Sequence, residues 1–366
     1  MVNRNTPTRQ VRAAWRWANF LTEEAKRDGK VPLLVNLDET SVPFSAANTK
    51  GNMILAMPRR QTEPTERPTM NISRKTTRAH FTHVAVICDD PTMQPLLPQV
   101  LIFNDKQITT RRAAALENDL PFNVRIIVKK SAWTDASVNA AILASIGKLL
   151  ESFPTKRAIV ILDTCNAHLD AAAWARAWGA GIWTCLVPPG LTWLLQPLDT
   201  HCFARYKAEL DIIAADRFRD LDRDPTAEDI AIAVGTVIRK VLQGSVWRRA
   251  FQETGWSHQQ RHISNTVAKQ IHFKPDDGNV GSTIPSDADL TATLPRGRRL
   301  ARSMLLAPWT AMPTRPPDSP VTRADAADTD PGPDGAVADR RVRRRRSDSP
   351  SGDTTWSDIT STVTAG

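Results

Sequence analysis

Short apolar runs that end in aspartate are the feature that most constrains the fold of this 366-residue chain. Three such runs are VPLLVNLD at 31–38, AIVILD at 158–163 and IWTCLVPPGLTWLLQPLD at 182–199. Short runs of this apolar character are typical of strands buried on both faces of a sheet. Because helix-like segments separate them, the three aspartates should collect at one edge of the sheet, where α/β folds place their sites.

Helix-like segments and a close pair of runs complete an α/β pattern. ASVNAAILASIGKLLESF carries its apolar residues at helical spacing, whereas FTHVAVICD and LLPQVLIF are strand-like runs divided by a turn. The close pair predicts antiparallel strands, and strands separated by helices predict parallel ones. We therefore expect a mixed five-stranded sheet flanked by helices. Its strands should lie at 31–42, 81–89, 96–103, 158–168 and 181–189, and its helices at 8–29, 136–153, 170–179, about 200–218 and after 224–229.

Composition divides the chain into four parts. We expect an N-terminal helical segment at 1–29, a catalytic domain at 30–256, a boundary segment at 257–275 and a tail at 276–366. The tail is rich in Pro, Asp, Ser, Thr and Arg and poor in aliphatic clusters, which predicts disorder. Its run RRVRRRR at 340–346 resembles a nuclear import signal or a DNA-gripping arm, with a solubilising tail as the alternative.

The positive charge lies in the part of the chain that should fold. From residue 276 onward 12 Arg face 13 Asp, which leaves 36 basic and 26 acidic residues before it, a net charge of +10. A basic folded surface indicates a polyanionic partner, nucleic acid first and an anionic membrane second. The densest basic stretch outside the tail is either a set of contacts to the DNA backbone or an ordinary solvated loop. It comprises Arg59, Arg60, Arg74, Lys75 and Arg78.

Features of other protein classes are missing from the sequence. There is no secretory signal and no apolar run long enough to span a membrane. The four cysteines show no CxxC pair and no zinc-like Cys/His spacing, which favours reduced thiols in an intracellular protein. They are Cys88, Cys165, Cys185 and Cys202.

Asp38, Asp163 and Asp199 together suit a metal centre. Carboxylates about 4 Å apart repel each other by about 4 kcal/mol per pair at an effective dielectric near 20, and a divalent cation removes that cost. Mg²⁺ prefers carboxylate oxygens, and two ions about 3.5–4 Å apart serve phosphoryl transfer. Phosphodiester cleavage is therefore the chemistry that the three would support. The alternative for each is a helix cap or a turn former.

The sequence around each aspartate resembles a known family. NLDET contains Asp38 and Glu39, and DTCNAH contains Asp163 and His168. PPGLTWLLQPLD contains Gln196 and Asp199 and is followed by Phe203 and Lys207. These words resemble those of the DDE superfamily endonuclease domain of pogo/Tigger-type transposases, in the wider Tc/mariner group. The resemblance extends over residues 30–256, and WRRAFQETGW is similar to the close of that domain.

This resemblance implies an RNase H-like fold and a nuclear enzyme that hydrolyses DNA phosphodiesters and can transfer strands in DNA recombination. It implies Asp38, Asp163 and Asp199 as catalytic residues that hold Mg²⁺, which Mn²⁺ can replace. Glu39, His168 and Gln196 would support those ligands, and Lys207 would contact DNA. His168 has a structural role as its alternative. The partner would be DNA, and the enzyme would act as a homodimer or with a separate DNA-recognition subunit.

Two other classes of function stay open. Thr164 stands where the family has asparagine, and we expect the helix-turn-helix module of the family to be missing, supplied in trans or replaced. A catalytically inactive, domesticated DNA- or chromatin-binding protein is therefore the main alternative. The presence of all three aspartates favours the enzyme. A scaffold that uses the fold for protein contacts alone would have no affinity for metal.

Overall fold

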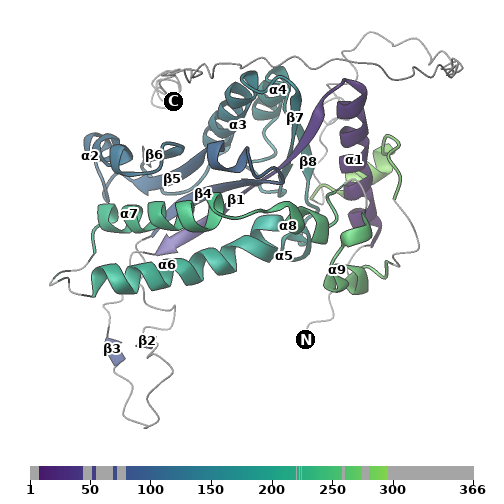
Figure 1. Cartoon of the computed structure of the whole chain (residues 1–366). Coiled ribbons are helices and arrows are strands. Elements are labelled where there is room, and N and C mark those ends of the chain that lie inside the picture. The colour runs from purple at the N-terminus through teal and green to yellow at the C-terminus, as the bar shows by residue number, and fades with distance from the viewer. Residues whose placement is uncertain are drawn as a thin grey trace, which may run out of the picture. The chain divides into compact units, whose positions relative to one another are not determined.

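The computed structural model describes residues 8–43, 52–54, 69–71, 80–219, 221, 223, 225–257, 260–273 and 280–295. A six-stranded sheet forms the core of this part of the chain (Figure 1). Its strands are β1 (Val31–Pro43), β4 (His80–Cys88), β5 (Gln99–Asn104), β6 (Val124–Lys129), β7 (Lys156–Leu162) and β8 (Trp183–Leu186). They lie in the order β6-β5-β4-β1-β7-β8.

Strand directions confirm the expected mixed sheet of an α/β fold. Pairs β1–β4 and β4–β5 are antiparallel, whereas β1–β7, β7–β8 and β5–β6 are parallel, so β4 alone of the six runs against the others. The expectation of five strands was wrong, because VRIIVK forms β6 at the edge of the sheet. Several of its residues are only partly buried, so the segment lacks the continuous apolar run that marked the inner strands.

Helices cover both faces of the sheet. The helices are α1 (Thr8–Arg27), α2 (Thr110–Leu116), α3 (Ala136–Glu151), α4 (Ala171–Gly179), α5 (Thr192–Leu195), α6 (Phe203–Phe218), α7 (Ala227–Val237), α8 (Arg248–Glu253), α9 (Asn265–Gln270) and α10 (Asp287–Ala292). Short 3₁₀ turns lie at Gln94–Leu96, Glu117–Asp119 and Gln260–His262, and π-helical turns at Leu198–Cys202 and Ile238–Gln243. In Figure 1, α3 and α4 lie on one side of the sheet and α6 and α7 on the other.

Local sequence explains where these helices begin. The carboxylates of Asp135 and Asp170 accept the amides of Val138 and Ala173, which caps α3 and α4. At α7, Thr226 and Asp229 form a reciprocal capping box. Each cap satisfies backbone amides that the first helical turn leaves without partners.

Strand β7 lies at the centre of the hydrophobic core. Its last five residues, 158–162, are fully buried, as the apolar run predicted. Burying one aliphatic side chain of this kind contributes about 1.5–3 kcal/mol. The end of β7, and with it the position of Asp163, is therefore held by the core.

Helix α1 packs against the sheet and against the end of the predicted catalytic domain. The indole nitrogen of Trp15 donates to the carbonyl oxygen of Thr254 at 3.1 Å. Gly255 follows with a φ of +84°, and a Cβ atom there would lie 2.2 Å from the Trp15 ring. Only glycine meets both requirements, the left-handed backbone and the close approach of the indole.

Part of the predicted tail is folded, which corrects the expectation of disorder from residue 276. Residues 280–295 include α10, whose Leu290 is buried against α1. A single amphipathic turn of this kind gives too weak a pattern to be recognised beside so many Pro and Asp residues. Residues 276–279 and 296–366, including the run at 340–346, lie outside the described residues.

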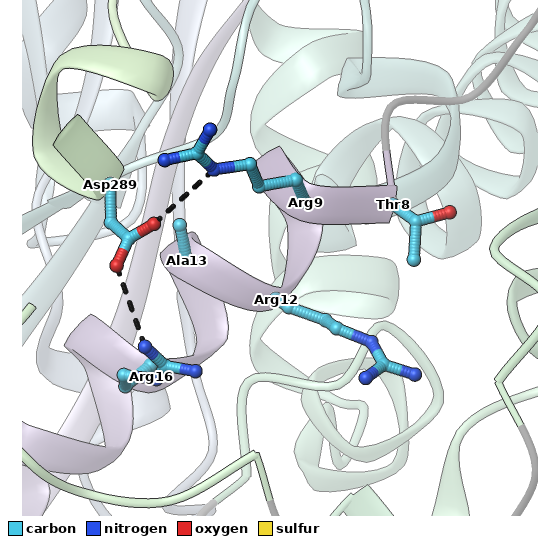
Figure 2. Close-up of a pocket in the computed structure, with 6 residues that line it drawn as sticks. All are labelled: Thr8, Arg9, Arg12, Ala13, Arg16 and Asp289. Carbon is cyan, nitrogen blue, oxygen red and sulfur yellow. Dashed lines mark hydrogen bonds and ion pairs between the residues drawn. The ribbon is translucent and has the colours of Figure 1, made fainter.

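A pocket of about 310 Å³ lies between α1 and α10, and Figure 2 shows the residues that line it. Asp289 of α10 pairs with Arg9 at 3.5 Å and with Arg16 at 3.4 Å. The guanidinium of Arg12 lies 5.5 Å from the centre of the Phe273 ring. None of the three predicted catalytic aspartates lines this pocket.

The segment between β1 and β4 contains a second, small sheet. Strands β2 (Asn52–Ile54) and β3 (Thr69–Asn71) pair antiparallel. The predicted DNA contacts in this segment lie outside the described residues: Arg59, Arg60, Arg74, Lys75 and Arg78. No helix in the described part of the chain combines the length and apolar character that crossing a membrane requires.

Candidate metal centre

The pairing of β1 with β7 brings Asp38, which lies within β1, to the level of Asp163, the residue that follows β7. Asn36 of β1 is the register partner of Ile161 of β7, and each aspartate lies two residues further along its chain. Parallel neighbours run about 4.8 Å apart. Asp38 itself is 8% exposed, and its carboxylate accepts the amide of Glu39 at 2.8 Å.

Asp163 begins the loop that follows β7, and its carboxylate organises that loop. Its Oδ1 accepts the amide of Cys165 at 3.0 Å and lies 2.6 Å from Nδ1 of His168. His168 is fully buried, and its carbonyl oxygen accepts the indole N–H of Trp174 at 2.6 Å. The five-residue spacing in DTCNAH thus places a histidine against the second aspartate.

Asn36 links the third aspartate to the other two, and the sequence analysis missed it. This buried side chain donates to the carbonyl oxygen of Ile161 at 2.9 Å and accepts the amide of Leu198 at 2.9 Å. Leu198 directly precedes Asp199, so Asn36 joins β1, β7 and the π-helical turn at Leu198–Cys202. An amide in the middle of the apolar run LLVNLD was the available signal, because buried polar groups need partners.

The C-terminal segment supports the same turn from its other side. Trp256 donates its indole N–H to the carbonyl oxygen of Leu195 at 2.6 Å. His201 lies within the turn, and its Nε2 is 2.8 Å from Oε2 of Glu253. WRRAFQETGW therefore acts at the site indirectly, because it holds the segment that carries Asp199.

The three aspartates influence one another electrostatically. Burial raises the pKa of Asp38 well above its usual value, and the charge of Asp199 adds to this effect. Burial and the charge of Asp163 raise the pKa of Asp199, whereas Lys207 lowers it. For Asp163, burial acts upward, but the hydrogen bond and charge of His168 bring its pKa below the usual value. The site therefore concentrates negative charge that its neighbours only partly compensate.

Gln196 leaves polar atoms unsatisfied near this charge. Its side chain is fully buried, and neither amide atom has a hydrogen-bond partner in the described part of the chain. It lies three residues before Asp199, whereas Lys207 is exposed on α6 four residues beyond Phe203. Unsatisfied buried amides are rare in folded proteins and call for a specific explanation.

The carboxylate oxygens of the three aspartates are the hard donors that Mg²⁺ prefers, but the three side chains do not converge on a single ion position. Among the described residues, the groups of three candidate ligands within 4.8 Å of one another do not include the three aspartates together. A pair of ions about 3.5–4 Å apart does not require them to, because carboxylates hold such a pair from different sides. The uncompensated charge and the orphaned amide of Gln196 agree with a cation-binding role.

Within the described part of the chain, the candidate ligand atoms that do lie within 4.8 Å of one another belong to Glu39, Cys165 and His168. Glu39 Oε1 lies 3.5 Å from His168 Nε2. Glu39 follows Asp38 within β1, and successive residues of a strand face opposite sides of the sheet. Its carboxylate reaches the histidine that holds Asp163, so Glu39 acts on the site through His168.

Comparison with known proteins bears on the same segments. The chain is similar to the solved structure described as "Mos1 transposase paired-end complex with left transposon end", with 16% sequence identity and a TM-score of 0.32. That match covers 68% of this chain and 62% of the other. Curated proteins give no match. Residues 82–239, which include Asp163 and Asp199, match the family model described as DDE superfamily endonuclease.

Proposed function

We propose that this protein is a transposase-derived DNA endonuclease of the pogo/Tigger type. Its three-aspartate site would use Mg²⁺, or Mn²⁺ in its place, to hydrolyse DNA phosphodiesters and to transfer strands. We further propose that it acts in the nucleus on DNA, as a homodimer or with a separate DNA-recognition subunit. The described helices offer no membrane span, and the match to DDE superfamily endonucleases supports DNA as the partner.

One observation carries the proposal: carboxylates from three distant parts of the sequence come close enough that, besides burial, the charges of Asp163 and Asp199 raise the pKa of Asp38 and the charge of Asp163 raises that of Asp199. Like charges are costly to hold together, and folding gains nothing from such an arrangement by itself. A bound divalent cation reverses the sign of the interaction. Perturbed carboxylates of this kind are typical of functional sites.

Each residue then has a distinct task. Asp38 and Asp163 would hold cations from neighbouring strands, and Asp199 would complete the site from the turn before α6. When bound, such cations activate water and stabilise the charge that develops on the phosphate. His168 orients Asp163, and Asn36 positions the turn that carries Asp199. The exposed ammonium of Lys207, near enough to lower the pKa of Asp199, would contact a DNA phosphate.

Nicking of supercoiled plasmid by the full chain tests the proposal. The full chain is needed because α10, beyond residue 275, packs on α1. We expect nicking that depends on Mg²⁺ or Mn²⁺ and falls by about 10²-fold or more in Asp163→Asn and in Asp199→Asn, as expected for groups that stabilise transition-state charge. Asp216→Asn is the matched control, since its side chain is 82% exposed on α6.

Two outcomes would contradict the proposal. Nicking that persists in both site variants would come from a contaminating nuclease or from other residues. DNA binding without metal and without nicking would instead identify the domesticated binding protein. Loss of activity in Asp216→Asn would show that the assay reports surface charge rather than the metal centre.

A further inference from the structure

We propose that Glu39, Cys165 and His168 form a second metal site, selective for a borderline-soft cation such as Zn²⁺. One ligand atom from each lies within 4.8 Å of the other two. Thiolate and imidazole favour Zn²⁺, whereas Mg²⁺ prefers oxygen alone. The site therefore differs in chemistry from the three-aspartate centre beside it, and it would exist whether or not the protein cuts DNA.

His168 is prepared for a metal by the hydrogen bond on its other nitrogen. Its Nδ1 is bonded to Asp163 at 2.6 Å, which leaves Nε2 to face Glu39 at 3.5 Å. Histidines that ligate zinc generally donate their second N–H to a carboxylate, which sets the tautomer and the orientation of the ring. In a tetrahedral zinc site, nitrogen and oxygen ligands lie about 3.3–3.5 Å from each other, close to the separation found here.

The Nε2 atom of His168 is the independent sign that a ligand is missing. The ring is fully buried, and in the described part of the chain Nε2 makes no hydrogen bond of good geometry, although it lies 3.5 Å from Oε1 of Glu39. A buried ring nitrogen in this state costs free energy unless a proton shared with Glu39 or a metal ion satisfies it. Burial lowers the pKa of His168, but hydrogen bonds with Asp163, Cys165 and Glu39 raise it well above its usual value, so the metal-free ring is an imidazolium between two carboxylates. A zinc ion would take the place of the proton on Nε2.

Access and ligand type favour the ion. Of the four cysteines, Cys165 is the one that is partly exposed. Glu39 is also partly exposed, with 22% of its side chain accessible. Three protein ligands with solvent access leave a fourth tetrahedral position for water. Asp163 would connect this site with the three-aspartate centre through His168.

Sequence spacing alone does not reveal this site. Cys165 and His168 come from the loop after β7, whereas Glu39 comes from β1, more than a hundred residues earlier. Zinc motifs are recognised by local pairs on both sides of the ion. Here the second side is a single carboxylate that only the pairing of β1 with β7 brings into place.

Titration of the metal-free full chain with Co²⁺, followed by absorption, tests the inference. We expect the intense visible bands of tetrahedral Co²⁺ and a thiolate-to-cobalt charge-transfer band, both removed by equimolar Zn²⁺ and unaffected by excess Mg²⁺. Cys165→Ser should lose the charge-transfer band and bind Zn²⁺ at least about 10-fold more weakly. Asp199→Asn should keep the band, since Asp199 belongs to the other centre.

Alkylation of Cys165 provides a second measurement that needs no variant. Zn²⁺ should slow the reaction of iodoacetamide with Cys165 by about 10-fold or more, and Mg²⁺ should leave the rate unchanged. A cobalt spectrum identical in the wild type and Cys165→Ser, or equal alkylation rates with and without Zn²⁺, would overturn the inference. The proposed nuclease would be unaffected by that result, just as failure of the nicking assay would leave this spectrum intact.

Discussion

Two groups of buried polar residues lie in the same sheet, and they differ in how well they are satisfied. On β4, Nδ1 of His83 lies 2.9 Å from the hydroxyl of Tyr206, and Nε2 lies 3.3 Å from Oε1 of Gln99. Gln99 also bonds the amide and the carbonyl of Val86. On β1, Asp38 instead faces other carboxylates, and burial together with their charges raises its pKa.

This contrast separates a structural network from a site that needs a ligand. The His83 group is neutral and fully hydrogen-bonded, so it stabilises the fold as it stands. The aspartate group keeps an uncompensated charge, and nearby Gln196 keeps orphaned amide atoms. Folding tolerates that cost because the core around β7 is large, and a cation would remove it. Protonation or substitution should therefore change the stability of the folded protein in opposite directions at the two groups.

Acid should destabilise the protein through His83, and this is the largest effect that we expect. Burial lowers the pKa of His83 from 6.5 to about 4. The unfolded chain therefore binds a proton before the folded one does, so stability is complete above about pH 6.5 and is lost as the pH falls through 4. The shift corresponds to about 3 kcal/mol. Denaturant unfolding of the wild type and of His83→Gln between pH 7 and 4 measures it.

The His83→Gln variant should show a flatter dependence on pH over that window. Burial raises the pKa of Asp90, but the hydrogen bonds from Lys156 and Thr92 bring it down to about 2, so this carboxylate titrates mainly below pH 4. Asp89, whose pKa burial raises to about 7, titrates within the window in both proteins. Equal slopes for the variant and the wild type would show that His83 is not neutral in the folded protein.

Removing one hydroxyl from the satisfied network should be costly. Tyr206→Phe leaves Nδ1 of the buried His83 without its partner, and such a loss costs about 1–3 kcal/mol. Chemical denaturation should report this decrease, while Mg²⁺-dependent nicking at 25 °C should stay near that of the wild type. A stability equal to the wild type would mean that water replaces the hydroxyl, and the two groups would then differ less than we infer.

Neutralising Asp38 should have the opposite effect on the metal-free protein. Because the pKa of Asp38 is raised in the folded state, its contribution to stability is present at low pH and is lost as the pH rises through that pKa. Asp38→Asn avoids ionisation, so at pH 7 it should be more stable than the wild type, by about 1.4 kcal/mol for each unit of the shift. Thermal unfolding with a metal chelator present measures the difference.

The same variant should respond less to metal. Mg²⁺ at 100 times its dissociation constant stabilises a single-site protein by about 2.7 kcal/mol, and Asp38→Asn should lose most of that gain. Tyr206→Phe should keep it. If Asp38→Asn destabilises the metal-free protein, Asp38 is a structural residue and the site carries no uncompensated charge.

Removing an exposed ion pair should have the smallest effect on stability, and it serves as the control for the other substitutions. Arg9, 70% exposed, pairs with Asp289 at the pocket between α1 and α10 (Figure 2). Exposed pairs contribute about 0–1 kcal/mol, so Arg9→Ala should change stability by less than about 1 kcal/mol at any salt concentration. A larger loss would indicate that α10 contributes more to the fold than its short contact with α1 suggests.

Sequence patterns predicted the inner strands and most of the large helices, because the burial of these elements is reflected in the local spacing of their apolar residues. Apolar runs marked β1, β7 and β8, and helical spacing marked α3. Strand β6 and helix α10 were missed, since one is a partly exposed edge strand and the other a single turn in a polar segment. The predicted DNA contacts between β1 and β4 fall outside the described residues.

For the site, the sequence by itself determined which residues could act, and the tertiary structure decided how they meet. Aspartate at the end of an apolar run is a local signal, so Asp38, Asp163 and Asp199 were predicted as a metal site, and that prediction awaits the experiments above. Two contacts between segments far apart in the chain had no such signal. Asn36 holds Leu198, 162 residues away, and Glu39 reaches His168. Neither contact can be predicted from the spacing of residues in the sequence, because both depend on the pairing of β1 with β7 and on how the following segments pack against that pair.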